Sequence, residues 1–115
     1  MTKSIDWLYQ RKSCATCQKA RDHLAAAAVP VAESVDAVKV RMDPTEALAL
    51  LEGMTKLVAA KGKSVVELDL IGERPDDATL LKHLIGPTGN LRAPTAKVGT
   101  VVLVGFHPGA YDSAL

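Results

Sequence analysis

The stretch RKSCATCQKARDHL, residues 11–24, contains both cysteines of the chain, Cys14 and Cys17, separated by two residues. The segment before it, residues 5–9, is apolar-rich and partly alternating, as is typical of a strand. The segment after it, residues 15–29, has apolar residues at helical spacing and is followed by a proline. The pattern therefore predicts that the cysteine pair lies at the junction between a first strand and a first helix.

The segments at either end of the chain predict a familiar order of elements. Residues 31–37 can form a second strand, and residues 94–98 and 100–106 are typical of two strands joined tightly at Gly99. A short helix should then begin at His107. The order is β-α-β, a helical insertion, then β-β-α, with a right-handed βαβ unit first. The predicted fold class is α/β, a thioredoxin-like fold with a mixed sheet flanked by helices.

The middle of the chain is predicted to be mainly helical. The segment Asp43-Pro44-Thr45-Glu46 is a strong helix start, because its aspartate can cap the helix and its glutamate can close a capping box. Apolar residues continue that element as far as Val58, with a bend or break at Gly53. Residues 65–70 are extended by propensity, without an assigned partner. A further helix is predicted to open at Pro75-Asp76.

Length, composition and charge narrow the classes of function. The chain has 115 residues, 48% of them hydrophobic, which suits one domain over residues 1–115. Its 14 basic and 13 acidic residues give a net charge of +1, so we expect neither nucleic acid nor a membrane as partner. The first residues lack the apolar core of a signal peptide and no segment is long enough to span a bilayer, which favours a cytoplasmic protein. In a reducing compartment, a close cysteine pair is more often catalytic or metal-binding than a structural disulfide.

The position of the cysteine pair favours redox chemistry. A free thiol is mostly protonated at neutral pH, and the N-terminus of a helix stabilises the thiolate. Cys14 would lie at that end, with Arg11 and Lys12 close in sequence, whereas Cys17 would be enclosed one turn later. This asymmetry predicts Cys14 as the attacking thiol and Cys17 as the resolving thiol, acting on a disulfide of a protein or a small molecule through a mixed disulfide.

Two other interpretations of the pair stay open at this point. The cysteines could be small, inert core residues, because free cysteine is often buried. A zinc site would need about four ligands, but the chain has no second cysteine pair, and His23, His83 and His107 are scattered. We therefore expect no bound metal or cofactor.

The segment Cys14-Ala15-Thr16-Cys17-Gln18-Lys19-Ala20 resembles the C-x-T-C-x-K-A motif of the arsenate reductase/Spx family, a branch of the thioredoxin fold with a helical insertion. Later segments resemble the family in the same order, so the resemblance covers nearly the whole chain: Lys61-Gly62, Glu67-Leu68-Asp69-Leu70, Leu91-Arg92-Ala93-Pro94 and Leu103-Val104-Gly105-Phe106. The chain looks most like a subgroup in which some relatives carry selenocysteine where this chain has Cys14. The resemblance implies that nucleophilicity matters at that position.

The chain also departs from the arsenate reductases, which hold the oxyanion with three arginines. The first of the three regions reads Ala59-Ala60-Lys61, and the third reads Val104-Gly105-Phe106. In the second region Ala93 precedes Pro94, and Arg92 is displaced by one residue. A lysine or a shifted arginine does not reproduce the rigid fork of a guanidinium.

The resemblance further implies a cis-proline loop beside the cysteines. The segment Leu91-Arg92-Ala93-Pro94-Thr95 falls where that loop lies in thioredoxin-type folds, so we predict a cis Ala93–Pro94 bond close to Cys14. The backbone of Ala93 could pair with an extended substrate, and Pro94 lacks an N–H that would compete for the thiolate. Arg92 and Lys12 could supply positive charge. We therefore predict that the substrate-binding residues are Lys12, Arg92, Ala93 and Pro94.

Three functions follow from these observations. The first is a thiol–disulfide oxidoreductase that takes electrons from glutathione or from a thioredoxin system. The second is a glutathione-linked arsenate reductase, which the missing arginines weaken. The third is an Spx-like redox switch that binds a protein partner, although nothing in this sequence identifies the surface with which Spx-type regulators bind RNA polymerase. We expect the first.

Overall fold

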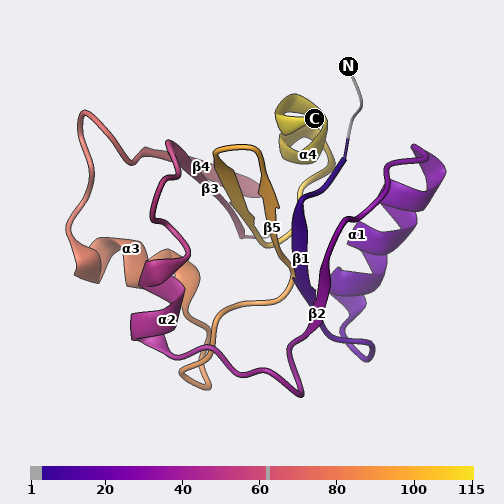
Figure 1. The fold of residues 1–115 in the computed structure, drawn as a ribbon, viewed down its shortest axis with the longest axis horizontal. Coiled ribbons are helices and arrows are strands. Elements are labelled where there is room, and N and C mark those ends of the chain that lie inside the picture. Colours follow the sequence, from indigo (N-terminus) through magenta and orange to yellow (C-terminus); the bar gives the residue numbers. More distant parts are fainter. Residues whose placement is uncertain (1–3, 62) are drawn as a thin grey trace.

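In the computed structural model, which describes residues 4–61 and 63–115, six strands form one mixed sheet (Figure 1). The strands are β1 (Trp7–Gln10), β2 (Ser34–Asp36), β3 (Lys56–Lys61), β4 (Ser64–Asp69), β5 (Thr95–Val98) and β6 (Val101–Val104). Their spatial order is β2-β1-β5-β6-β3-β4, with β1 parallel to β2, β3 parallel to β6, and the other neighbours antiparallel. The sequence-based expectations for the first three residues and for Gly62 lie outside the described residues.

Helices cover both faces of this sheet (Figure 1). They are α1 (Ala15–Ala26), α2 (Pro44–Ala49), α3 (Asp77–Leu84) and α4 (Pro108–Ala114). Successive strand residues point to opposite faces, so Leu57 packs with the α2 and α3 side while Val58 packs with the α1 and α4 side. Within the described residues, no helix has the length and apolar character that crossing a membrane requires.

The arrangement confirms the predicted fold class. The unit β1-α1-β2 places two parallel strands side by side, and β5 and β6 form an antiparallel hairpin followed by α4. The predicted tight connection at Gly99 is confirmed, with a φ of +58° that favours glycine. The protein has an α/β, thioredoxin-like fold, in which the ends of β1 and β6 and the start of β5 lie side by side at the same end of the strands.

The prediction of a helical element reaching Val58 is wrong. That residue lies in β3, which pairs with β4 on one side and with β6 on the other. All four residues from Leu57 to Ala60 are buried. A strand that is covered on both faces reads as a continuous apolar run, and such a run has neither the helical nor the alternating period that distinguishes the two structures. The insertion is therefore two short helices around a β-hairpin.

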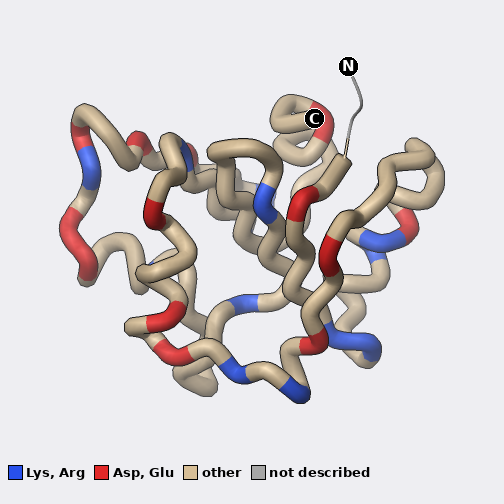
Figure 2. Tube along the Cα trace, in the orientation of Figure 1, with Lys and Arg blue, Asp and Glu red and all other residues tan. Residues whose placement is uncertain are grey.

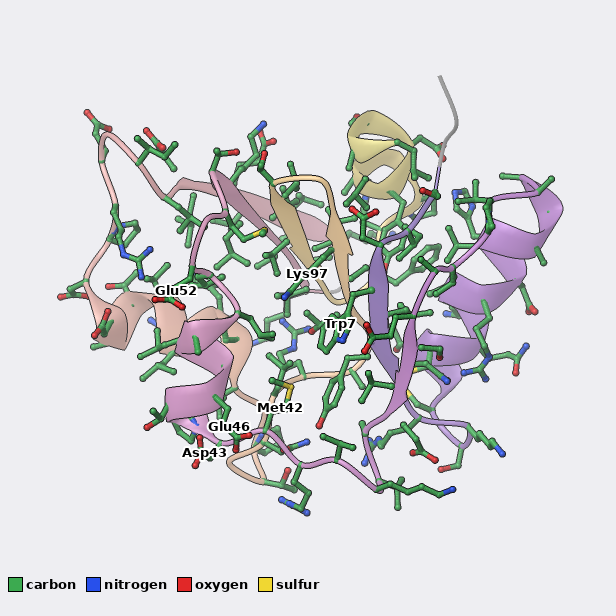
Figure 3. The ribbon with its side chains drawn as sticks, in the orientation of Figure 1. Trp7, Met42, Asp43, Glu46, Glu52 and Lys97 are labelled. Atoms are coloured by element: carbon green, nitrogen blue, oxygen red, sulfur yellow. The ribbon has the colours of Figure 1, made fainter. Side chains whose placement is uncertain are left out.

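The predicted helix starts in this insertion are confirmed. Asp43 caps α2 and forms the expected capping box with Glu46, at the position labelled in Figure 3. Asp76 caps α3 by accepting the N–H of Thr79 at 2.9 Å. The first helix ends earlier than expected, at Ala26, because the chain turns at Ala28, whose φ is +55°.

Candidate functional site

Cys14 is the N-cap of α1. Its Sγ accepts a hydrogen bond from the backbone N–H of Cys17 at 3.3 Å, and its carbonyl accepts one from Gln18 at 3.0 Å. The side chain is partly exposed, and the thiol carries no disulfide. The sulfur therefore replaces the oxygen of a Ser, Thr or Asp cap, where the unpaired N–H groups of the helix favour an anion.

Cys17 lies one turn along α1 and is fully buried. Its Sγ accepts a hydrogen bond from the backbone N–H of Arg11 at 3.4 Å. Burial raises the pKa of Cys17 to about 11, and the neighbouring Cys14 adds to this rise. The structure thus gives the two thiols opposite surroundings, because one is partly open to solvent and the other is enclosed.

The pKa of Cys14 lies below the usual thiol value. Partial burial raises it, but hydrogen bonds from the thiol and N–H of Cys17 and from the N–H of Thr16, together with the charge of Arg11, outweigh burial. The thiolate is therefore more abundant at neutral pH than in a free cysteine. Of the two cations expected near this thiol, only Arg11 acts on its pKa; Lys12 is exposed in the loop before α1.

Arg21 holds this loop in place. Its guanidinium donates to the backbone carbonyl of Arg11 at 3.2 Å, to that of Lys12 at 3.4 Å, and to the side-chain carbonyl of Gln10. Arg21 belongs to α1, so these bonds tie the end of β1 and the loop to the helix that carries both cysteines. Arg21 was not predicted as part of the site, and its spacing of seven residues after Cys14, two turns along the same helix, was the available signal.

The loop before β5 lies against Cys14, as predicted. The Ala93–Pro94 peptide bond is cis, and the carbonyl oxygen of Ala93 lies 3.8 Å from the Cys14 Sγ. Pro94 is buried, and its carbonyl accepts the N–H of Gly105 at 2.8 Å. The buried Thr95 hydroxyl donates to the carbonyl of Arg92 at 2.6 Å. The loop is thus fastened at both ends, with the backbone of Ala93 facing the thiol.

Arg92 is directed into the fold. Its guanidinium donates to the carbonyl of Ala60 at 2.9 Å and to that of His83 at 3.4 Å, and burial lowers its pKa. Gly105 makes room for it, since a Cβ there would lie 3.2 Å from the guanidinium and only 2.5 Å from the Ala60 oxygen. Arg92 joins β3, α3 and the Pro94 loop, and part of its donor capacity is already used.

Two hollows flank Arg92. The Arg11 groove, about 240 Å³, includes Arg11, Gly86, Pro87, Asn90, Arg92 and Ala93 in its walls. The Lys82 groove, about 340 Å³, includes Lys61, Ser64, Lys82, His83, Pro87 and Arg92. The first touches the cysteine site through Arg11 and Ala93. The second lies beyond Arg92, at the end of β3.

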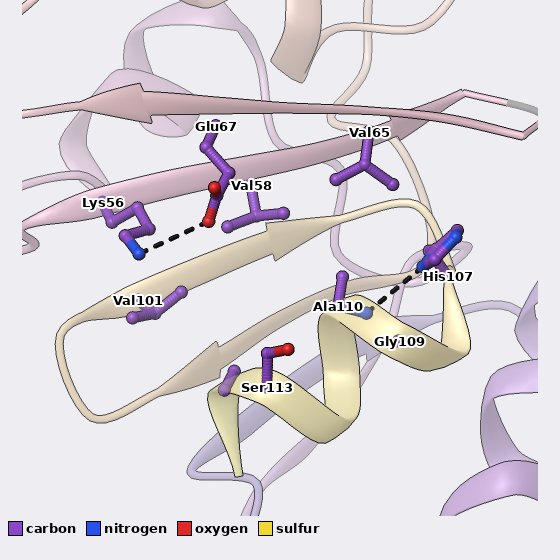
Figure 4. Close-up of a pocket in the computed structure, with 10 residues that line it drawn as sticks. Lys56, Val58, Val65, Glu67, Val101, His107, Gly109, Ala110 and Ser113 are labelled. Carbon is purple, nitrogen blue, oxygen red and sulfur yellow. Dashed lines mark hydrogen bonds and ion pairs between the residues drawn. The ribbon is translucent and has the colours of Figure 1, made fainter.

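A third hollow lies away from the cysteines, between the β3–β4 hairpin and α4 (Figure 4). It is about 350 Å³ in volume, and the ion pair of Lys56 with Glu67, 3.4 Å apart, lies on its wall. None of its lining residues takes part in the hydrogen bonds of the Cys14 and Cys17 sulfurs. Across residues 4–61 and 63–115, no group of three or more metal-ligating side chains comes together.

Comparisons with known proteins bear on the fold. No protein-family model and no curated protein matches the chain. A solved structure, the YffB (PA3664) protein, is similar with a TM-score of 0.56 and 24% sequence identity, over 95% of this chain and 97% of that chain. The similarity therefore extends over both chains almost entirely and supports the thioredoxin-like fold. The chemistry has to be argued from the residues of this chain.

Proposed function

We propose that the protein is a thiol–disulfide oxidoreductase in which Cys14 attacks and Cys17 resolves. The observation that carries the proposal is the difference between the two thiols. Cys14 caps a helix and has a lowered pKa, while Cys17 is enclosed and has a pKa of about 11. A partly open thiolate beside a protonated, buried thiol is the arrangement that two-step disulfide exchange requires.

The reaction consists of two exchanges. The Cys14 thiolate attacks one sulfur of a substrate disulfide, forms a mixed disulfide with it, and releases the other half as a thiolate. Cys17 then loses its proton and attacks the Cys14 sulfur, which forms the Cys14–Cys17 disulfide and releases the second substrate thiolate. Two electrons have passed to the substrate, and a thiol reductant, either glutathione or a thioredoxin-type dithiol protein, must restore the pair.

The local geometry supports each step. In the first, the N–H of Cys17 and the end of α1 stabilise the attacking thiolate, and the carbonyl of Ala93 beside it can accept an N–H of an extended substrate. In the second, Cys17 reaches Cys14 without a large change, because the two residues occupy one helical turn. The high pKa of Cys17 keeps it protonated, so it does not compete for the substrate in the first step.

Arsenate reduction has less support from the geometry. Arg92 donates to the carbonyls of Ala60 and His83, and Ala93 stands where the family carries an arginine. A fixed pair of guanidinium groups aimed at an oxyanion near Cys14 is therefore missing from the described residues, and charge-assisted contacts of that kind are the strong ones. We expect feeble reduction of arsenate, and robust turnover at micromolar arsenate would favour the arsenate reductase instead.

Turnover and trapping test the proposal together. The wild-type protein should reduce a small disulfide repeatedly when a thiol donor is supplied, whereas a redox switch would react once and stop. The Cys17→Ser variant should accumulate a mixed disulfide on Cys14, which mass spectrometry detects and from which the bound thiol can be identified. A Cys14→Ser variant is the matched control and should trap nothing. Trapping on Cys17 alone, or no turnover with any donor, would contradict the proposal.

A further inference from the structure

The Arg11 groove and the Lys82 groove meet at Arg92. Both include Gly86, Pro87 and Arg92 in their walls, so they are adjacent hollows on one side of the Pro94 loop. One end of the combined surface reaches Ala93, whose carbonyl is 3.8 Å from the Cys14 sulfur. The other end reaches Lys61 and Lys82. A ligand held at Cys14 can therefore extend past Arg92 into the Lys82 groove.

The walls of the two grooves are basic. Arg11 and Arg92 line the first, and Lys61, Lys82 and His83 join Arg92 in the second. Among the described residues that line either groove, none is acidic. The ion pairs found within residues 4–61 and 63–115 are His23 with Asp112 and Lys56 with Glu67, so neither lysine of the Lys82 groove has a carboxylate partner there.

This positive charge is local. Lysines and arginines exceed aspartates and glutamates by one over the whole chain, and Figure 2 shows basic and acidic residues at many places along the chain. In the same view the acidic residues are frequent around α2 and in the loop before α3. A protein with nearly balanced charge that places only cations along one groove has there a preference for anionic ligands.

The distance between the cysteine site and the Lys82 groove suits an extended peptide. Lys61 ends β3, which is two strands away from β5, and the Pro94 loop leads into the start of β5. Neighbouring strands are about 4.8 Å apart, so Lys61 lies roughly 10 Å across the sheet from the Pro94 loop, against which Cys14 lies. One residue of an extended peptide spans about 3.3 Å. A carboxylate about three residues from a reacting cysteine would therefore reach the Lys82 groove.

Carboxylates fit this groove better than a compact oxyanion does. Lys61 and Lys82 are exposed, flexible point charges on different elements, and Arg92 has part of its guanidinium bonded to backbone carbonyls. Such groups attract separated negative charges but do not form the rigid fork that selects phosphate or arsenate. Ala59, Val66 and Ile85 in the same walls add apolar contact for the rest of a peptide.

We infer that the Lys82 groove binds acidic side chains of an extended peptide whose cysteine forms the mixed disulfide with Cys14. The inference rests on the proposed function and adds the class of substrate: a protein disulfide in an acidic segment, with Asp or Glu about three residues from the cysteine. Lys61 and Lys82 supply the attraction, and Arg92 marks the passage between the two grooves.

Three peptides test the inference. Each carries one cysteine joined to thionitrobenzoate, and they differ only in having glutamate, glutamine or lysine at the third and fourth positions on both sides of it. Attack by the Cys14 thiolate joins the peptide to Cys14 and releases the coloured thionitrobenzoate anion, whose rate of appearance is measured. At low salt the acidic peptide should react about threefold to tenfold faster than the neutral one, the scale of two exposed charge pairs. Added salt should reduce this ratio.

Two variants of equal charge provide the control. Lys61→Gln with Lys82→Gln should bring the acidic-to-neutral ratio to about one. Lys56→Gln with Lys97→Gln removes the same charge elsewhere, beside Glu67 and Trp7, and should leave the ratio as in the wild type. The neutral peptide shows that each variant is folded and reactive.

The possible outcomes separate the two proposals. Equal rates for the three peptides, or a ratio that the Lys61 and Lys82 changes leave intact, would overturn the inference while the proposed function stands. No release from any peptide would contradict the proposed function and the inference with it. Loss of the preference in phosphate, but not in chloride of the same ionic strength, would assign the groove to a small oxyanion and also overturn the inference.

Discussion

The first turns of α1 and α2 have the same capping geometry but use different acceptor atoms. At α2 the Oδ1 of Asp43 accepts the N–H of Glu46 at 2.8 Å, whereas at α1 the Sγ of Cys14 accepts the N–H of Cys17 at 3.3 Å. A carboxylate is ionised at neutral pH and is among the preferred caps. A thiol is a weak acceptor until it loses its proton.

The charged residues around the two caps also differ. Glu46 stands in the first turn of α2, where its carboxylate accepts a hydrogen bond from the N–H of Asp43 at 3.3 Å. The first turn of α1 contains no acidic residue, which would repel a thiolate, and Arg11 lies close to the sulfur. The start of α2 is therefore suited to stability, and the start of α1 to holding an anion that can react.

Replacing Cys14 with Asp should have the largest effect, because it gives α1 the same kind of cap as α2. A carboxylate at the cap strengthens the hydrogen bond to Cys17, so the free energy of unfolding should rise by on the order of 1 kcal/mol. Disulfide reduction should fall by at least about a thousandfold, because the attacking group is gone. Urea unfolding and disulfide turnover measure the two effects. A variant that is less stable than the wild type would show that the sulfur cap is not the weaker one.

Raising the pH should lower the stability of the reduced protein through the enclosed thiol of Cys17. The pKa of Cys17 is raised from about 9 to about 11, so its contribution to stability is complete below pH 9 and is lost as the pH rises through 11. The loss amounts to roughly 2–3 kcal/mol for a shift of two units. Unfolding of the reduced protein against pH measures it, with Cys17→Ala as reference. Parallel curves for the two proteins would show that Cys17 titrates at its ordinary value.

At the other helix start, Asp43→Ala should affect stability alone. The substitution removes the cap and half of the capping box, so the free energy of unfolding should fall by about 1 kcal/mol. Asp43→Asn keeps an acceptor at the same place and should recover most of the loss. Alkylation of Cys14 should proceed at the wild-type rate in both variants. Slower alkylation would mean that the two helix starts are coupled.

The smallest effect concerns the cation beside Cys14. Arg11→Gln removes a charge that lowers the pKa of Cys14, so that pKa should rise. Alkylation at pH 7 should slow by about twofold, the scale of one exposed charge interaction. Lys19→Gln removes an equal charge from an exposed part of α1 and should have no effect. If the two variants are alkylated at equal rates, the helix end and its hydrogen bonds lower the pKa of Cys14, and the charge of Arg11 does not.

Much of the fold could be predicted from local signals. The capping box at Asp43, the helix start at Pro75-Asp76 and the tight turn at Gly99 each depend on a few neighbouring residues, and the structure confirms all three. The strand containing Leu57 and Val58 could not be found in this way. Its identity depends on β4 and β6 lying on either side of it, and pairing of that kind leaves no period in a buried run.

The candidate site could likewise be predicted only in part from the sequence. The pattern of the cysteines placed Cys14 at the start of a helix and Cys17 inside, and the family resemblance placed the loop of Pro94 beside them. The contacts of Arg92 with Ala60 and His83 were not foreseen. The contact with Ala60 joins residues 32 apart in the sequence, and Lys61 and Lys82, which meet in one groove, also come from separate elements.

The pH dependence of cysteine alkylation, followed by peptide mapping, tests the central claim most directly. In the reduced protein, modification should occur first at Cys14, and its rate should follow a pKa below the usual thiol value. Cys17 should react only at much higher pH, near its pKa of about 11, or after unfolding. Modification that begins at Cys17, or a Cys14 titration at or above the usual value, would contradict the claim that the start of α1 is built to hold a reactive thiolate.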